Sequence, residues 1–536
     1  MGGAVLEERV GQCIKECIKE RIKERLMSAA VDYSDVQGLV RFGFGNMTEA
    51  VYLLLQVRNP AAARAWLEQA PVTSAADQSP VPSTALQVAF TRQGLEALRV
   101  PQQVIAGFSA EFLSGMAGDA NRSRRLGDTG ANAPSTWEWG GEHNVPHLVL
   151  MLFAEDGQLD AWQQSLTGPL FQGAFEEIGR LGTSDLGGRE HFGFIDGISQ
   201  PQIDWSGSRT VSVNGNQLAY GNRVCLGEFL LGYPNEYSRY TERPLLDANE
   251  AGSEDLPQAE DQPAKKDLGR NGTYVVMRQL RQNVRAFWQY VDEATKSLHE
   301  SGYDLAESML GRRLEDGAPL MPLNQAAISG VGQAGSAAKR AKDARLNQFT
   351  FDSDPDGTRC PIGAHIRRGN PRTADLPGHP KGLLAQGLHL LGFGQNNLRE
   401  DLAATVRFHR VLRRGREYGP GLSPGEAMQP APAGDPERGL HFVALNANIE
   451  RQFEFIQNAW MARSKFDGLT EESDPLLGNR EPVEGCPFTN TFSIPQQGKA
   501  RRRLMEMPQF VTVRGGAYFF MPGIRALRFL SKTGGA

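Results

Sequence analysis

Stretches with strand-like and helix-like apolar spacing recur in both halves of this 536-residue chain. In the first half, "ALQVAFTRQGLEALRV" (85–100) predicts a strand, a glycine and a helix, and "LVLMLFA" (148–154) predicts a buried strand. In the second half, "FVTVRGGAYFFMPGIRALRFL" (510–530) predicts a strand, a Gly-Gly turn, a second strand and a helix. A chain of this length exceeds one ordinary hydrophobic core, so we expect two halves built from strands and helices.

Two further segments complete this layout. The apolar residues of "VQGLVRFGF" (36–44) predict another strand. The segment 246–272 is polar and rich in Pro and Gly, which predicts an exposed connection and sets the midline near residue 265. We therefore expect an N-terminal extension at 1–34, a first half at 35–265 and a second half at 266–536.

The extension contains "CIKECIKERIKERLM", in which apolar residues recur every four positions between Lys and Glu. This spacing predicts a short amphipathic helix with i,i+4 ion pairs. It is either an appended docking helix or a self-association helix, and nothing in it indicates catalysis. The residues of its apolar face are Ile14, Ile18, Ile22 and Leu26.

Composition excludes several classes of function. The net charge of −5 provides no basic surface, so we expect no nucleic-acid partner. The longest apolar runs are too short to span a bilayer, so we expect no membrane partner. The N-terminus shows neither a signal-peptide core nor a twin-arginine signal, which favours the cytoplasm. None of the five cysteines forms a Cys-x-x-Cys pair, which argues against a disulfide scaffold or a zinc site.

The stretch "HFGFIDGISQP" (191–201) places a carboxylate, Asp196, among apolar residues and glycines. A buried carboxylate needs a partner. Taken alone, Gly-x-x-Asp-Gly is also compatible with an ordinary turn, because Asp-Gly is a common turn dipeptide.

A second stretch, "RCPIGAHIRRGNPR" (359–372), surrounds His365 with apolar residues and then with arginines. A histidine in this setting is either a satisfied core residue or a ligand. Haem iron is often held by one histidine, and nearby arginines would neutralise the haem propionates. A phosphate site is an alternative.

A third stretch, "RFHRVLRRGREYGPG" (407–421), carries Arg413 and Arg414 after an apolar pair. These arginines either form a solvated basic face or include one cation that points into a cavity. In the second case the cation would be a suitable partner for Asp196.

Together, and in this order, the three stretches resemble the dye-decolorizing peroxidases. The resemblance extends from about Asp35 to the end of the chain and includes "LGDTG", "GLHFVALNANIERQFEFIQNAW" and "FVTVRGGAYFF". It implies an α+β fold of two ferredoxin-like halves, each an antiparallel sheet with flanking helices. It also implies one haem b per chain, in a pocket of the second half.

The resemblance implies a role for each matching residue. His365 would be the axial ligand of the haem iron, Asp196 the distal acid–base residue, and Arg413 the distal arginine, which would also contact the cofactor. Arg414 is the alternative to Arg413 after a shift of one position, and Arg367 would contact the haem. The acid that supports the proximal histidine in many relatives aligns with Asn448, and Glu450 is the nearest carboxylate. A neutral Asn448 would make His365 less basic and raise the haem reduction potential.

The implied activity is reduction of hydrogen peroxide coupled to one-electron oxidation of dyes, phenols or other small donors. The resemblance also implies a homo-oligomer, a dimer or larger. The main alternative is a protein that carries, stores or demetallates haem, which would not need both Asp196 and Arg413. A hydrolase or phosphate-site enzyme is a second alternative, but no nucleophile elbow or phosphate loop supports it.

Overall fold

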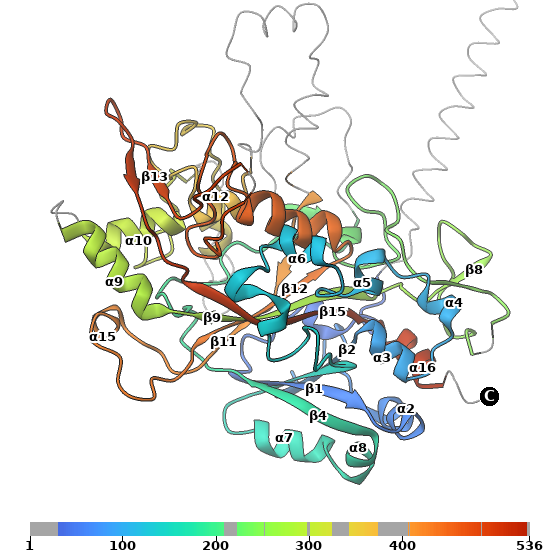
Figure 1. The fold of residues 1–536 in the computed structure, drawn as a ribbon. Helices are drawn as coiled ribbons and strands as arrows, with labels where there is room; N and C mark the ends of the chain where they lie inside the picture. Colours follow the sequence, from blue (N-terminus) through green and yellow to red (C-terminus); the bar gives the residue numbers. More distant parts are fainter. Residues whose placement is uncertain are drawn as a thin grey trace, which may run out of the picture.

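The computed structural model describes residues 31–532, apart from 208–221, 251, 297–300, 324–341, 373–405, 407 and 484. The expected amphipathic helix lies outside these residues. The main feature is a nine-stranded antiparallel sheet in the order β10-β12-β9-β15-β2-β3-β1-β4, with β11 also paired to β12 (Figure 1). Its strands are β1 (Glu49–Val57), β2 (Thr84–Phe90), β3 (Leu148–Ala154), β4 (Phe175–Gly182), β9 (Thr273–Gln282), β10 (Leu412–Arg413), β11 (Arg416–Tyr418), β12 (Gly439–Asn446) and β15 (Val511–Met521).

The sheet is assembled from two groups of strands that are separate in sequence. Strands β1 to β4 come from the first half of the chain, and the other five come from the second half. The groups meet where Phe520 of β15 pairs with Phe90 of β2. Antiparallel sheets with flanking helices confirm the α+β fold class, while the proposed domain limits stay a prediction.

Both faces of the sheet are covered, which explains the nearly continuous apolar strands. On β1, Val51, Leu53 and Leu55 belong to the core on one face, and Tyr52 and Leu54 belong to the core on the other face. Alternate side chains of a strand point to opposite faces, so one apolar run contributes to both cores.

Helices cover the two faces and the ends of the sheet. Figure 1 shows α6 and α12 over the part formed by β9, β12 and β15, whereas α7 and α8 lie beside β4. No helix of the described residues is long and apolar enough to cross a membrane. The α-helices are α2 (Pro60–Gln69), α3 (Arg92–Ala97), α4 (Gln102–Ile105), α5 (Ala110–Ser114), α6 (Ala120–Leu126), α7 (Leu159–Leu166), α8 (Pro169–Ala174), α9 (Val284–Thr295), α10 (Gly302–Leu310), α12 (His365–Gly369), α15 (Pro424–Ala427) and α16 (Ile524–Lys532).

Shorter elements lie outside the large sheet and these helices. The 3-10 helices are η1 (Gly38–Val40), η2 (Gly130–Asn132), η3 (Pro134–Thr136) and η4 (Leu226–Glu228), and the π-helical segments are η7 (Glu450–Glu454) and η8 (Ile456–Ala462). Three two-stranded sheets pair β5 (Gln202–Asp204) with β6 (Arg223–Cys225), β7 (Leu245–Asp247) with β8 (Lys265–Asp267), and β13 (Phe492–Ile494) with β14 (Arg502–Leu504).

Two strand predictions are wrong in detail. The segment 36–44 forms η1 and turns instead of a strand. The predicted Gly-Gly turn is instead an irregularity within one continuous strand, β15. Gly515 lies against the ring of Trp139, and a Cβ there would be 2.4 Å from Trp139 Nε1. These glycines therefore allow a close contact with the sheet and do not reverse the chain.

The polar segment 246–272 is more ordered than a simple exposed connection. Its ends pair as β7 and β8. Asp267 is buried and accepts a hydrogen bond of 2.6 Å from Nε of the buried Arg243. The prediction failed here because composition alone does not reveal such a buried ion pair.

Candidate active site

Asp196 lies at the end of a tight hairpin formed by residues 188–196. Arg189 pairs with Ile195, and the Asp196 N–H donates to the Gly188 carbonyl over 3.0 Å. Gly193 and Gly197 have φ values of 99° and 82°, in the left-handed region that favours glycine. The two glycines on either side of Asp196 therefore allow the turns that point the carboxylate inward.

Arg413, on β10, forms an ion pair with this carboxylate. Its Nη1 lies 3.0 Å from Asp196 Oδ1. Gln200 fixes the two segments together, because its side chain accepts from the Arg413 N–H and donates to the Arg413 carbonyl, both over 3.1 Å. Arg414 points elsewhere and donates to the carbonyls of Leu39 and Val40. The geometry thus brings together Asp196 and Arg413 and leaves Arg414 outside the pair.

Electrostatics favour the ionised form of Asp196. Burial alone would raise the pKa of Asp196, but the Arg413 guanidinium and a hydrogen bond from the Gly197 N–H outweigh it. The pKa is therefore below its ordinary value. About a third of each side chain of the pair is accessible, and this surface faces a cavity.

His365 begins α12, and its ring is held by a carboxylate that is distant in sequence. Its Nδ1 lies 3.0 Å from Asp474 Oδ2. The other oxygen of Asp474 accepts the N–H groups of Leu476 and Leu477 over 2.9 and 2.8 Å. Burial opposes ionisation of both groups, but their mutual attraction lowers the pKa of Asp474 and raises that of His365. Because Nδ1 is engaged, Nε2 is the ring nitrogen available to a ligand.

The prediction that Asn448 or Glu450 supports His365 is wrong. The Asn448 side chain accepts the Arg451 N–H over 2.7 Å, and Arg451 belongs to the π-helical segment η7. Glu450 is exposed to solvent. With the ionised Asp474 beside His365, the argument for a neutral partner and a raised reduction potential no longer holds.

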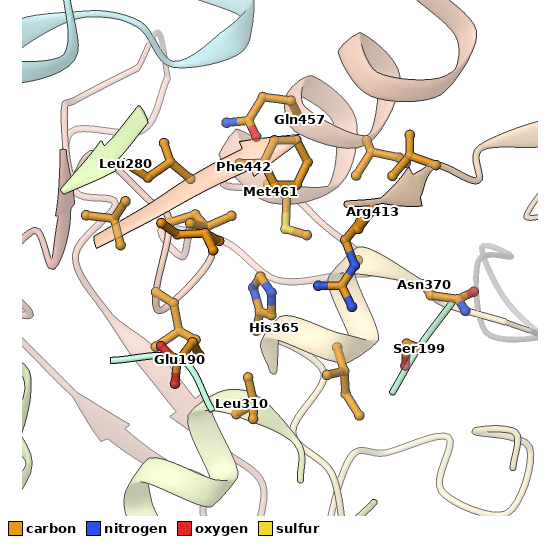
Figure 2. Close-up of a pocket in the computed structure, with 18 of the residues that line it drawn as sticks. Glu190, Ser199, Leu280, Leu310, His365, Asn370, Arg413, Phe442, Gln457 and Met461 are labelled. Atoms are coloured by element: carbon orange, nitrogen blue, oxygen red, sulfur yellow. The ribbon is translucent and has the colours of Figure 1, made fainter. Parts of the chain in front are cut away.

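Asp196, Arg413 and His365 line one cavity. Figure 2 shows the His365 ring and the Arg413 guanidinium pointing into it, with Glu190 at its edge. Most of the wall between them is apolar. The apolar lining includes Leu280, Leu310, Val411, Phe442, Phe453, Ile456, Met461 and Val511. Residues from both halves of the chain therefore form the site.

Arg367 does not line this cavity, contrary to the sequence prediction. It is fully buried, donates to the carbonyls of Asp354 and Cys360, and lies 3.6 Å from an Asp354 carboxylate oxygen. Helical geometry explains the difference, because residues two apart on a helix point in different directions. Arg312 and Arg372 line the cavity instead.

The chemistry of these side chains fits a haem. One histidine has a fixed ring and an Nε2 available to a ligand, much of the wall is apolar, and five arginines line the same cavity. Among the described residues, no cluster of three or more His, Cys, Asp or Glu could hold a bare metal ion. A single axial histidine suits an iron whose other ligands come from a porphyrin.

Comparison with known proteins identifies the class to which this fold and site belong, a haem-dependent oxidoreductase. No family model matches the sequence. The dye-decolorizing peroxidase msp1 of Mycetinis scorodonius is 28% identical over 94% of this chain and 88% of its own length. AauDyP1 of Auricularia auricula-judae is 28% identical over 93% and 87%. Over nearly its whole length, the chain resembles the dye-decolorizing peroxidases.

Solved structures agree with this assignment. The crystal structure of AauDyP complexed with imidazole superposes with a TM-score of 0.66 at 25% identity and covers 93% of this chain and 99% of that one. The Anabaena peroxidase of the same type gives a TM-score of 0.65 at 23% identity, with 93% and 94% covered, and supports the fold alone.

Proposed function

We propose that this protein is a peroxidase that uses one haem b per chain to reduce hydrogen peroxide and to oxidise dyes, phenols or other small one-electron donors. The observation that carries the proposal is the ion pair between Asp196 and Arg413, which faces the same cavity as His365. The similarity to proteins named dye-decolorizing peroxidases supports it. A pocket for simple haem storage would not need an acid–base group held ionised by a cation.

Two kinds of contact would hold the cofactor, one to its iron and one to its propionates. His365 Nε2 would hold the haem iron, and Asp474 would fix the ring and increase its basicity. Arg312 and Arg372 would provide positive charge for the propionates. When bound, the haem supplies the redox-active iron to which peroxide and electrons are delivered.

Asp196 would move the proton of the peroxide. Peroxide must lose a proton from one oxygen and gain one on the other before the O–O bond breaks. An ionised Asp196 accepts the first proton and returns it to the second oxygen. Arg413 stabilises the negative charge that develops on the peroxide oxygens, and it keeps Asp196 ionised between turnovers.

Steady-state turnover separates this function from the haem-handling alternative. The purified protein with bound haem should oxidise an anthraquinone dye or 2,6-dimethoxyphenol only when hydrogen peroxide is present. The Asp196→Asn variant should bind haem equally well but turn over slowly, by roughly 10²–10⁴-fold. A protein that binds haem tightly without turnover of any donor would support the haem-handling function instead.

Two other expectations stay predictions. The dimer or larger assembly can be measured by light scattering of the purified protein. The cytoplasmic location can be measured by fractionation of the native cells. Neither affects the chemistry proposed for the cavity.

A further inference from the structure

A second carboxylate, Glu190, lies beside the cavity and has no part in the function proposed above. It lines the cavity together with Asp196, and Figure 2 shows it at the cavity edge. It also lines a second hollow, a groove whose wall includes Tyr303, Leu314 and Leu422. Tyr303 is about half exposed, so this groove reaches the surface. Glu190 therefore belongs to both the wall of the cavity and the wall of the groove.

Neutral donors hold the Glu190 carboxylate in place. One oxygen accepts the Phe194 N–H over 3.0 Å, and the other accepts the Phe192 N–H over 2.9 Å and Gln282 Nε2 over 2.7 Å. Phe192 and Phe194 belong to the hairpin that carries Asp196. No Lys or Arg of the described part of the chain forms an ion pair with Glu190, in contrast to Asp196 with Arg413.

The two acids on this hairpin therefore differ in protonation. Burial raises the pKa of Glu190 to about 7, although its hydrogen bonds oppose this, and the negative charge of Asp196 raises it further. The pKa of Asp196 is lowered. Near neutral pH, Glu190 can hold or release a proton while Asp196 stays ionised.

Other charged groups near Glu190 do not provide an equivalent route. Glu417 interacts electrostatically with Glu190 but lines neither the cavity nor the groove. Arg189, a groove residue, donates to the carbonyls of Gly193, Leu314 and Glu315. Glu190 interacts electrostatically with Asp196, His365 and Glu417. Other titratable or charged groups share a wall with it: Arg189, His191, Glu307 and Glu315 line the groove, and Arg413 lines the cavity.

We propose that Glu190 is a positioning residue that carries protons between the solvent of the groove and Asp196. The proposal rests on the peroxidase function above. Reduction of one peroxide to two waters consumes two protons and two electrons, and a donor oxidised outside the cavity releases its protons to bulk solvent. The cavity must therefore draw protons from solvent. In the relay, the O–H bond of protonated Glu190 breaks as the proton passes to the Asp196 carboxylate, and a solvent proton then restores Glu190.

Glu190 also holds the hairpin together through its hydrogen bonds, so its replacement could slow the reaction for purely structural reasons. Chemical rescue distinguishes the two roles. The solvent protons are taken up together with the electrons of the donor, so the Glu190→Gln variant, once treated with peroxide, should return to the ferric state with a donor about a hundredfold more slowly, the lower end of the range for a positioned proton-transfer group. Formate or acetate buffer should restore its rate in proportion to buffer concentration, whereas the wild-type rate should not depend on buffer. Glu190→Asp keeps a titratable group and should lose less activity than Glu190→Gln.

Glu417→Gln is the matched control, because burial also raises the pKa of Glu417 to about 7. Its rate and buffer dependence should equal those of the wild type. Infrared difference spectra of the ferric protein can be recorded against pH without peroxide. Each Gln variant should lack one of the carboxyl groups that titrate near neutral pH in the wild type. A wild-type rate for Glu190→Gln, or a slow rate that buffer does not restore, would overturn the relay. A wild-type protein that binds haem but does not react with peroxide would overturn the peroxidase function itself.

Discussion

Replacement of Arg413 with leucine tests the distal pair most sharply. At the 3.0 Å separation of Arg413 Nη1 and Asp196 Oδ1, two unit charges attract by about 5 kcal/mol at an effective dielectric constant of roughly 20, before desolvation is subtracted. Loss of a donor that stabilises developing negative charge typically costs about 2.7–4 kcal/mol of transition-state stabilisation. The attraction between the Arg413 charge and a negative charge at hydrogen-bond distance is large enough to account for this cost. We expect Arg413→Leu to slow the reaction with peroxide by about 10²–10³-fold at neutral pH.

The same substitution should change the pH dependence in a defined direction. Asp196 accepts a proton only when ionised, so the rate falls as pH decreases through its pKa. Arg413 is the main group that lowers this pKa, so its removal raises the pKa and moves the fall in rate to higher pH. Stopped-flow measurement at the Soret band between acidic and neutral pH provides both quantities. Arg413→Lys should keep part of the effect, because it keeps the charge.

Arg414→Leu is the control for this experiment. Its guanidinium donates to backbone carbonyls away from the cavity, so the substitution should affect stability. The pH at which the rate falls on the acidic side should stay the same. The reasoning is refuted if Arg413→Leu keeps the wild-type rate and pH profile, or if Arg414→Leu shifts the profile equally.

Three further outcomes follow from the same contacts. His365→Ala should abolish or severely weaken haem binding, and a normal Soret band in this variant would exclude it as the axial ligand. Asp474→Asn should raise the haem reduction potential because His365 becomes less basic, whereas Asn448→Asp should leave the potential unchanged in spectroelectrochemical titration. Asp267→Ala should lower the free energy of unfolding by about 1.5–3 kcal/mol, because it removes one of the two carboxylates that accept hydrogen bonds from the buried Arg243 and leaves only Asp261; urea denaturation that shows no loss would contradict this.

The spacing of apolar residues correctly predicted strands and helices whose burial follows from their own sequence. The apolar run at 148–154 forms β3, and the strand and helix at 85–100 appear as β2 and α3. The same reasoning misread Gly515, because the ring of Trp139 that requires a glycine there lies far away in sequence. Periodicity describes burial along one element and carries no information about which distant side chain packs against it.

In the functional site too, partners that are distant in sequence were harder to predict than local features. Asp196 and Arg413 are 217 positions apart. The residues alone offered their pairing as one of two alternatives, and the resemblance to a family favoured it. Asp474 lies 109 positions from His365 in a stretch with no motif, so the sequence provided no signal for it. Arg367 was misassigned because its neighbours in sequence suggested an anion, whereas the fold turns it toward Asp354. Glu190 precedes the Asp196 motif directly, and a second acid beside a predicted buried one was a usable signal.

The optical spectrum of the purified protein before and after one equivalent of hydrogen peroxide tests the central claim most directly. We predict a ferric haem Soret band that corresponds to one haem per chain and that changes within the mixing time when peroxide is added. It should return to the starting spectrum when a phenolic donor follows. A protein that acquires no Soret band after incubation with haem, or whose band does not change with peroxide, would contradict the account.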